Sequence, residues 1–76
     1  MRVISKDGCI NVPYESNTFC VIIDEESKIY TVAVRNYNLT GFMELATYDT
    51  LEDAKTAFNK MIEAGSNPDV TVFYFN

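Results

Sequence analysis

The chain has 76 residues, of which 47% are apolar and 22% are charged, and its formal net charge is −5. This length suits one small domain over residues 1–76, because ordering such a chain costs about 1.5 kcal/mol per residue and apolar burial only just offsets that cost. An acidic surface repels phosphate backbones, which argues against direct binding of nucleic acid. Uncharged runs such as 36–43 are too short and too polar to cross a bilayer, and the N-terminal residues lack the apolar stretch of a signal peptide. We therefore expect a cytoplasmic protein with no membrane attachment.

The residue types that most enzymes and metal sites need are scarce in this sequence. There is no histidine, which excludes Ser-His and Cys-His pairs and the common zinc ligand sets. Cys9 and Cys20 are expected to be free thiols, since a small chain from an oxidising compartment usually carries several disulfides. The densest acidic cluster, 24–26, is typical of a solvated hairpin tip. We expect no enzymatic activity, no metal site and no cofactor.

The first half of the chain alternates short β-prone runs with turn residues. Asp7-Gly8 predicts a two-residue turn between strands over 2–5 and 9–12, and Pro13 ends the second of these strands. Runs rich in β-branched and aromatic residues over 18–24 and 28–36 predict a second hairpin, joined by polar residues.

A turn over 37–41 follows, in which Asn38 and Gly41 are candidates for positive φ, and a further strand is expected over 42–48. The hydrophobic period then changes to that of one helical face. The residues with this spacing are Leu51, Ala54, Ala57, Phe58, Met61 and Ile62.

Thr50 is a natural N-cap for this helix, and Gly65 is expected to supply a left-handed exit. A turn over 66–69 leads to a final strand over 70–75. The fold class predicted is α+β, with an antiparallel sheet of about five strands and one amphipathic helix before the last strand.

One helix covers only one face of a sheet, so the other face needs an explanation. Alternation assigns Phe19, Val21, Ile23, Tyr30, Val32 and Val34 to the helix side. The opposite side carries Cys20, Ile22, Ile29 and Ala33, which is more apolar than a solvated face. Either the sheet curls over its own second face, or these four residues form an interface with a second copy or another partner. We expect a homodimer.

The sequence contains more residues suited to binding than residues suited to catalysis. Arg35, Asn36, Tyr37 and Asn38 at a strand end are suited to grip a planar or anionic group. The alternative is a polar turn with one tyrosine on the sheet edge. A phosphorylated ligand would depend on Arg2 or Arg35, because cationic side chains are few.

The opening segment from Arg2 to Glu15 has the sequence RVISKDGCINVPYE. It resembles the N-terminus of small proteins encoded by phages and integrated elements of Gram-positive bacteria, and residues 46–50 with Glu52, Ala54 and Met61 resemble their passage from strand to helix. In many of those proteins glutamine stands at the position of Lys6 and aspartate at that of Asn11. The resemblance implies a mobile-element origin and no particular activity. The motif is either a purely structural hairpin or a recognition edge in which Tyr14 and Glu15 contact a partner.

These observations favour a non-enzymatic binding protein of phage or mobile-element origin. Its expected role is to block a host protein, such as a component of antiviral defence, by stoichiometric contact in the bacterial host cell. An acidic protein fits a partner with a basic surface, such as the groove of a nucleic-acid-binding protein. The alternatives are a sponge that sequesters a nucleotide signalling molecule and an accessory module that only dimerises.

Overall fold

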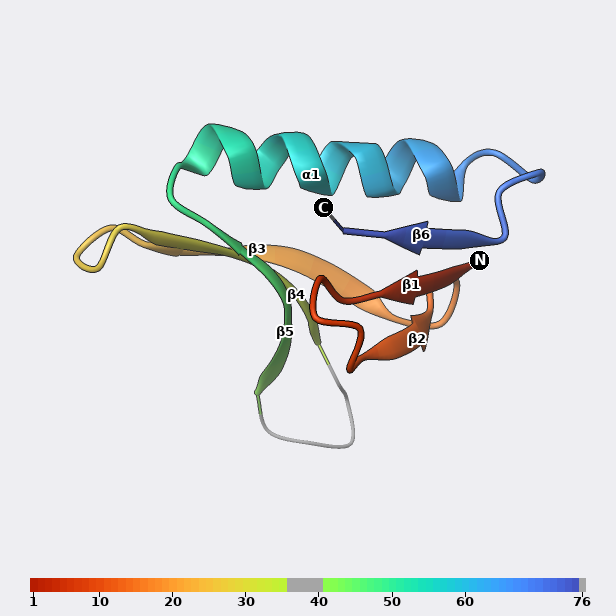
Figure 1. Ribbon diagram of the computed structural model, residues 1–76, viewed down its shortest axis with the longest axis horizontal. Coiled ribbons are helices and arrows are strands. Elements are labelled where there is room, and N and C mark those ends of the chain that lie inside the picture. Colours follow the sequence, from red (N-terminus) through yellow and green to blue (C-terminus); the bar gives the residue numbers. More distant parts are fainter. Residues whose placement is uncertain (36–40, 76) are drawn as a thin grey trace.

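The computed structural model describes residues 1–35 and 41–75 and confirms an α+β fold (Figure 1). One helix precedes the last strand, as the sequence predicts. The elements are β1 (Arg2–Ile4), β2 (Asn11–Pro13), β3 (Thr18–Asp24), β4 (Ile29–Arg35), β5 (Phe42–Tyr48), α1 (Leu51–Gly65) and β6 (Val72–Tyr74).

The strands form two sheets of three strands in place of one antiparallel sheet. Strands β3, β4 and β5 form an antiparallel meander in sequence order, and the second sheet has the order β2-β1-β6. The pairing of β1 with β6 is parallel, with Val3 opposite Phe73. Parallel neighbours need a long crossover, and the whole chain between β1 and β6, including α1, provides it. Sequence periodicity gives no signal for such a distant pairing.

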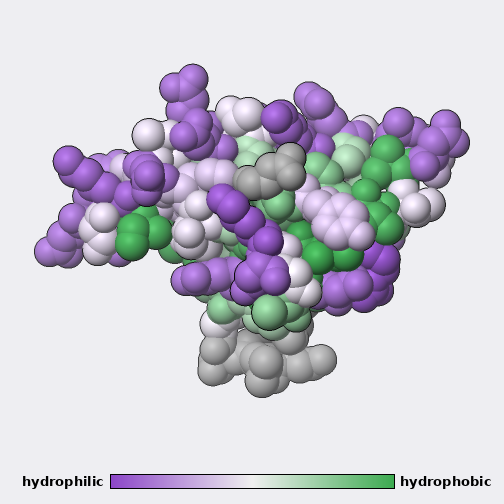
Figure 2. Space-filling model, in the orientation of Figure 1, coloured by the Kyte–Doolittle hydropathy of each residue, from purple (hydrophilic) through white to green (hydrophobic). Residues whose placement is uncertain are grey.

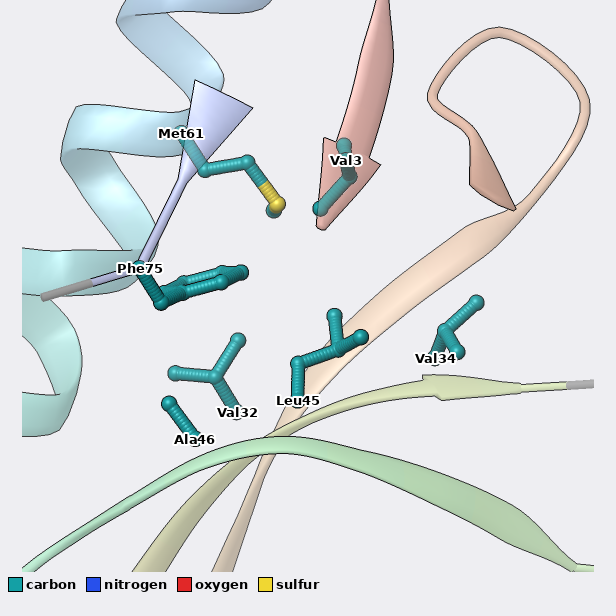
Figure 3. Packing of buried hydrophobic residues seen from close by; sticks show 7 residues of the cluster. All are labelled: Val3, Val32, Val34, Leu45, Ala46, Met61 and Phe75. Atoms are coloured by element: carbon teal, nitrogen blue, oxygen red, sulfur yellow. The ribbon is translucent and has the colours of Figure 1, made fainter. Parts of the chain in front are cut away.

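The helix and the small sheet pack on the same side of the β3-β4-β5 sheet, and the core lies between them (Figures 1 and 3). Every layer contributes to this core. Its buried members are Val3, Val32, Val34, Leu45, Ala46, Met61 and Phe75. Ile23 lies on the predicted side but is 50% exposed, since the β3-β4 hairpin extends beyond the end of α1 in Figure 1.

A β-bulge in β5 joins the two sheets. Val32 pairs with Ala46 and Ala33 pairs with Glu44, so Leu45 is an extra residue in its strand. Leu45 and Ala46 are consecutive yet both belong to the buried core, which strict alternation of side chains between the two faces forbids. The Leu45 carbonyl accepts a hydrogen bond of 2.8 Å from the Lys6 amide, just beyond β1.

The first hairpin forms where expected, but its turn is longer than the predicted two residues. Ser5 and Ile10 face each other, with the Ser5 amide donating to the Ile10 carbonyl at 2.9 Å, so the loop holds residues 6–9. The Ser5 hydroxyl is almost fully buried; it donates to Asp7 Oδ1 at 2.6 Å and accepts from the Ile10 amide at 2.9 Å. Asp7 Oδ1 also accepts from the Cys9 amide at 3.0 Å. These side-chain bonds favour the wider loop, in which Gly8 has the positive φ of 78°.

The other turns agree with the sequence where they are described. The second hairpin is present, with Lys28 in the left-handed region at a φ of 55°. Gly41 has a φ of 127°, as expected, while Asn38 lies outside the described residues.

The helix begins as predicted but ends differently. Thr50 is the N-cap, and its side chain accepts from the Asp53 amide at 3.1 Å. Gly65 is the last helical residue, and Ser66 caps the helix with an ordinary φ of −86°, so the predicted left-handed exit at Gly65 is wrong. A Cβ atom at position 65 would overlap the ring of Tyr14. Glycine stands here because an aromatic ring approaches the helix backbone closely.

We expect the Asp7→Asn variant to lose less of its free energy of unfolding than the parent protein as the pH falls. Hydrogen bonds from the Ser5 hydroxyl and the Cys9 amide lower the pKa of Asp7 below its usual 3.8. A carboxylate with a depressed pKa stabilises the fold at neutral pH, and that contribution is lost as the pH falls below about 4. Urea unfolding between pH 2.5 and pH 6 measures how the free energy of unfolding changes with pH. An equal pH dependence in the variant and the parent would contradict this role of Asp7.

Gly65→Ala is expected to lower the free energy of unfolding by about 1 to 3 kcal/mol, because the new methyl group meets the Tyr14 ring. Elsewhere in a helix the same change stabilises by about 1 kcal/mol. In a Tyr14→Ala background the substitution should therefore become neutral or stabilising. Urea titrations of the four proteins in this double-mutant cycle give the coupling, with Asn59→Ala as the control at an exposed helical position. Additive effects would show that the ring does not require glycine.

Candidate functional site

The predicted binding residues do not form one site. Arg35 is exposed at the end of β4, and Asn36, Tyr37 and Asn38 lie outside the described residues. Tyr14 stacks on Phe19, with ring centroids 5.6 Å apart, on the side of the sheet that faces the core. Because Phe19 pairs with Val34 and Arg35 is the next residue along β4, Arg35 points to the opposite face.

Glu15 forms an ion pair within the molecule. Its carboxylate accepts two hydrogen bonds from the N-terminal ammonium group, at 2.8 and 3.0 Å. This contact lowers the pKa of Glu15. The motif that ends in Tyr14 and Glu15 thus has a structural explanation: one residue packs on the helix end and the other holds the start of β1.

The face of the β3-β4-β5 sheet turned away from α1, which we call the outer face, does collect the four predicted interface residues. Strand register places Cys20 opposite Ala33 and Ile22 opposite Thr31, with Ile29 nearer the hairpin tip. Strand register places the following residues on this face: Thr18, Cys20, Ile22, Asp24, Ile29, Thr31, Ala33, Arg35, Phe42, Glu44 and Thr47.

The outer face is uneven in exposure. Ala33 and Thr31 are buried between the larger side chains of the flanking strands. Ile29 and Phe42 are 47% and 51% exposed, so the sheet does not curl far enough to cover this face. Burial raises the pKa of the half-buried Cys20 thiol, and the positive charge of Arg35 opposes that rise. Phe42 is an apolar member of this face that the sequence prediction missed.

A cavity of about 290 Å³ lies between α1 and β6. The helix contributes Asp53, Thr56, Ala57 and Lys60, whose spacing places them on one side of α1. Tyr48 and residues 73–75 of the last strand region complete the lining. Figure 2 shows hydrophobic side chains gathered over β1 and β6, while the surface of the helix is mostly hydrophilic.

Aromatic rings make up most of the strand side of this cavity. Phe73 and Phe75 meet edge to face, with ring centroids 5.0 Å apart, and Phe75 belongs to the core. Tyr74 points the other way along the strand and is 62% exposed. The cavity therefore has a rigid apolar wall with an exposed aromatic ring at its margin.

Tyr48 supplies an unusual polar group. Its hydroxyl oxygen is buried and has no hydrogen-bond partner among the described residues. Burial raises the pKa of Tyr48, and the negative charge of Asp53 raises it further. Lys6 Nζ lies 5.5 Å from the centroid of the Tyr48 ring, a cation–π distance. A buried hydroxyl without a partner is uncommon in native proteins and costs free energy of folding.

The sequence prediction did not include this cavity. Its helical side was predictable from the period of α1, but its strand side depends on β6 returning beside β1. Tyr48 stood out in the sequence only as part of the segment 46–50 before the helix.

Comparisons with protein-family models, with curated proteins and with solved structures give no match for this chain. Within residues 1–35 and 41–75, His, Cys, Asp and Glu side chains form no group of three or more that is placed to hold a metal ion. The described part of the chain also contains no helix with the length and apolar character needed to span a membrane.

We expect Tyr48→Phe to raise the free energy of unfolding by about 1 kcal/mol, because it removes a buried hydroxyl that has no partner. The variant should also keep more of its stability above pH 10, since a tyrosine with a raised pKa favours the unfolded state once the unfolded chain ionises. Urea unfolding at pH 7 and pH 10.5 tests both effects. Tyr74→Phe, at an exposed ring, is the matched control and should change stability by less than about 0.5 kcal/mol. A destabilised Tyr48→Phe variant would mean that the hydroxyl has a partner.

Proposed function

We propose that this chain is a non-enzymatic binding protein that blocks a basic, nucleic-acid-binding protein of a bacterial host by stoichiometric contact through the outer face. The observation that supports the proposal is an uncovered, partly apolar sheet face with acidic residues around it. The resemblance of the opening segment to phage and integrated-element proteins makes a component of antiviral defence the target class.

The exposed apolar residues of this face are suited to contact a partner at two separate points, one near each end of β4. Ile29 and Phe42 are each about half exposed. Between them, the small buried side chain of Ala33 leaves the middle of the face flat. Burying two such side chains against a partner stabilises a complex by about 1 kcal/mol or more for each, at about 25 cal/mol per Å². Interfaces commonly combine apolar contacts with polar and charged ones.

The charges around the face select the partner. The hairpin tip at one end carries the acids 24–26 and the cation Lys28, Glu44 lies at the β5 side, and Arg35 is the cation at the other end. The rim is therefore mainly negative, as is the whole chain at −5. A basic surface with an apolar hollow complements it, and such surfaces are typical of proteins that bind nucleic acid.

A second copy of the chain is the competing occupant. A two-fold axis that crosses the strands would bring Arg35 of each copy toward Asp24 of the other. This arrangement predicts a stable dimer in the absence of any host protein.

The test is capture of the host partner, followed by reconstitution from purified components and native mass spectrometry. We expect a complex of fixed stoichiometry that weakens steeply with salt and is displaced by duplex DNA. Phe42→Lys and Ile29→Lys should each weaken it at least tenfold, because they place a cation at an interface with a basic partner. Ile62→Lys, at an exposed apolar residue of α1, is the matched control and should bind normally.

Other outcomes overturn the proposal. A homodimer that Phe42→Lys disperses, with no host protein bound, would assign the outer face to self-association. A host complex that neither outer-face substitution weakens would place the contact elsewhere. Circular dichroism confirms that each variant is folded, and the exposure of both residues favours that result.

A further inference from the structure

We infer that the cavity between α1 and β6 binds a small molecule with a planar, amino-bearing ring system at one end and one anionic group at the other. This site is separate from the outer face, and the inference does not depend on the protein-blocking function.

The size of the cavity limits the ligand. Its volume of about 290 Å³ corresponds to roughly ten water molecules at about 30 Å³ each. Small-molecule pockets start at about this volume, so the space suits one ring system with a short substituent. An oligonucleotide or a folded partner is too large for it.

The walls favour a flat, aromatic ligand. Tyr48, Phe73 and Phe75 present aromatic rings along one side, and Ala57 leaves space on the helix opposite them. Tyr74 stands at the margin of the cavity. Stacked and edge-to-face contacts of this kind favour planar molecules over flexible aliphatic ones.

The charged groups at the two ends of the cavity determine the orientation of a bound ligand. Asp53 and Lys60 both line the cavity and are seven residues apart on α1, which corresponds to about 10 Å along the helix axis. Asp53 lies at the end of the cavity near Tyr48, where its carboxylate can accept a hydrogen bond from a ring amino group. The Lys60 ammonium lies toward the other end, where it can pair with an anionic group.

The local charge differs from that of the whole chain. Six Lys and Arg residues are set against eleven Asp and Glu residues in the sequence, yet Lys60 lines the cavity and Lys6 lies over the ring of Tyr48. Among the described lining residues, Lys60 is the cation and Asp53 is the acid, while Lys6 lies outside the lining, over the Tyr48 ring. The cavity can therefore hold an anionic ligand within an acidic protein.

Two kinds of molecule share the required chemistry, namely a nucleoside monophosphate with an amino-bearing base and an aminoaryl carboxylate. Titrations followed by NMR and calorimetry with AMP and with 4-aminobenzoate distinguish them, and adenosine serves as the probe without an anion. We expect one of the two anionic probes to bind saturably with shifts at residues 53–60 and 73–75, and adenosine to bind at least tenfold more weakly than AMP if AMP is the ligand.

The variants identify the site. Lys60→Glu should weaken binding at least tenfold, because it removes the cation of the cavity lining. Lys55→Glu changes the net charge equally on the exposed side of α1, outside the cavity lining, and should leave the affinity within twofold. Because Phe42 lies on the other side of the sheet, Phe42→Lys should also leave the affinity unchanged, which keeps this test independent of the outer face.

Three results would overturn the inference. If neither AMP nor 4-aminobenzoate binds saturably up to millimolar concentration, the cavity is not a binding site for such ligands. Equal affinity for adenosine and AMP, with no 4-aminobenzoate binding, would show that the ligand needs no anionic group. Equal loss of binding in Lys55→Glu and Lys60→Glu would show that binding depends on the net charge of the protein and not on a contact with Lys60.

Discussion

The bulge at Leu45 determines how the two sheets meet. It turns two consecutive side chains of β5 into the core and leaves the Leu45 carbonyl free to accept the Lys6 amide. That bond holds the end of β1 over the side of the large sheet that α1 covers. Because β6 pairs with β1, the bulge also determines indirectly where the aromatic wall of the cavity lies.

A second contact closes the molecule at the far end of the helix. The Tyr14 ring lies against the backbone of Gly65 and stacks on Phe19, so it connects the end of β2, the start of β3 and the last turn of α1. A 76-residue chain has little core to spare, and nonlocal contacts of this kind hold short strands that would be unstable alone. Val3, fully buried in β1, is enclosed between the two contacts.

The same bulge explains what sequence patterns could and could not predict. Helix α1 and its Thr50 cap were predictable because the signals are local. Counting alternate residues back from Tyr48 places Phe42 on the core side, but the extra residue at Leu45 inverts the strand and moves Phe42 to the outer face. Cys20, Ile22, Ile29 and Ala33 precede the bulge in the chain, so alternation assigned them to one face correctly.

Gly65 and the parallel pairing of β6 were beyond local reasoning for a related reason. Glycine after a helical period usually signals a left-handed exit, and only the position of Tyr14, fifty-one residues earlier in the sequence, gives it another role here. The strand side of the cavity likewise depends on which distant strand β6 joins. The helical side, with Asp53 and Lys60, follows from the period alone.

Net charge is a weaker guide to ligands than the distribution of charge. The excess of acids in the sequence favours a basic macromolecular partner and disfavours an anionic small molecule. The local charge differs between the two surfaces, because acids 24–26 and Glu44 lie around the outer face, whereas the described lining of the cavity contains one cation, Lys60, and one acid, Asp53. Long-range repulsion from the whole chain slows the approach of an anion and is screened at physiological salt, whereas a contact with Lys60 inside a partly closed cavity is screened much less. Affinity at the cavity is therefore governed by the few charges that line it.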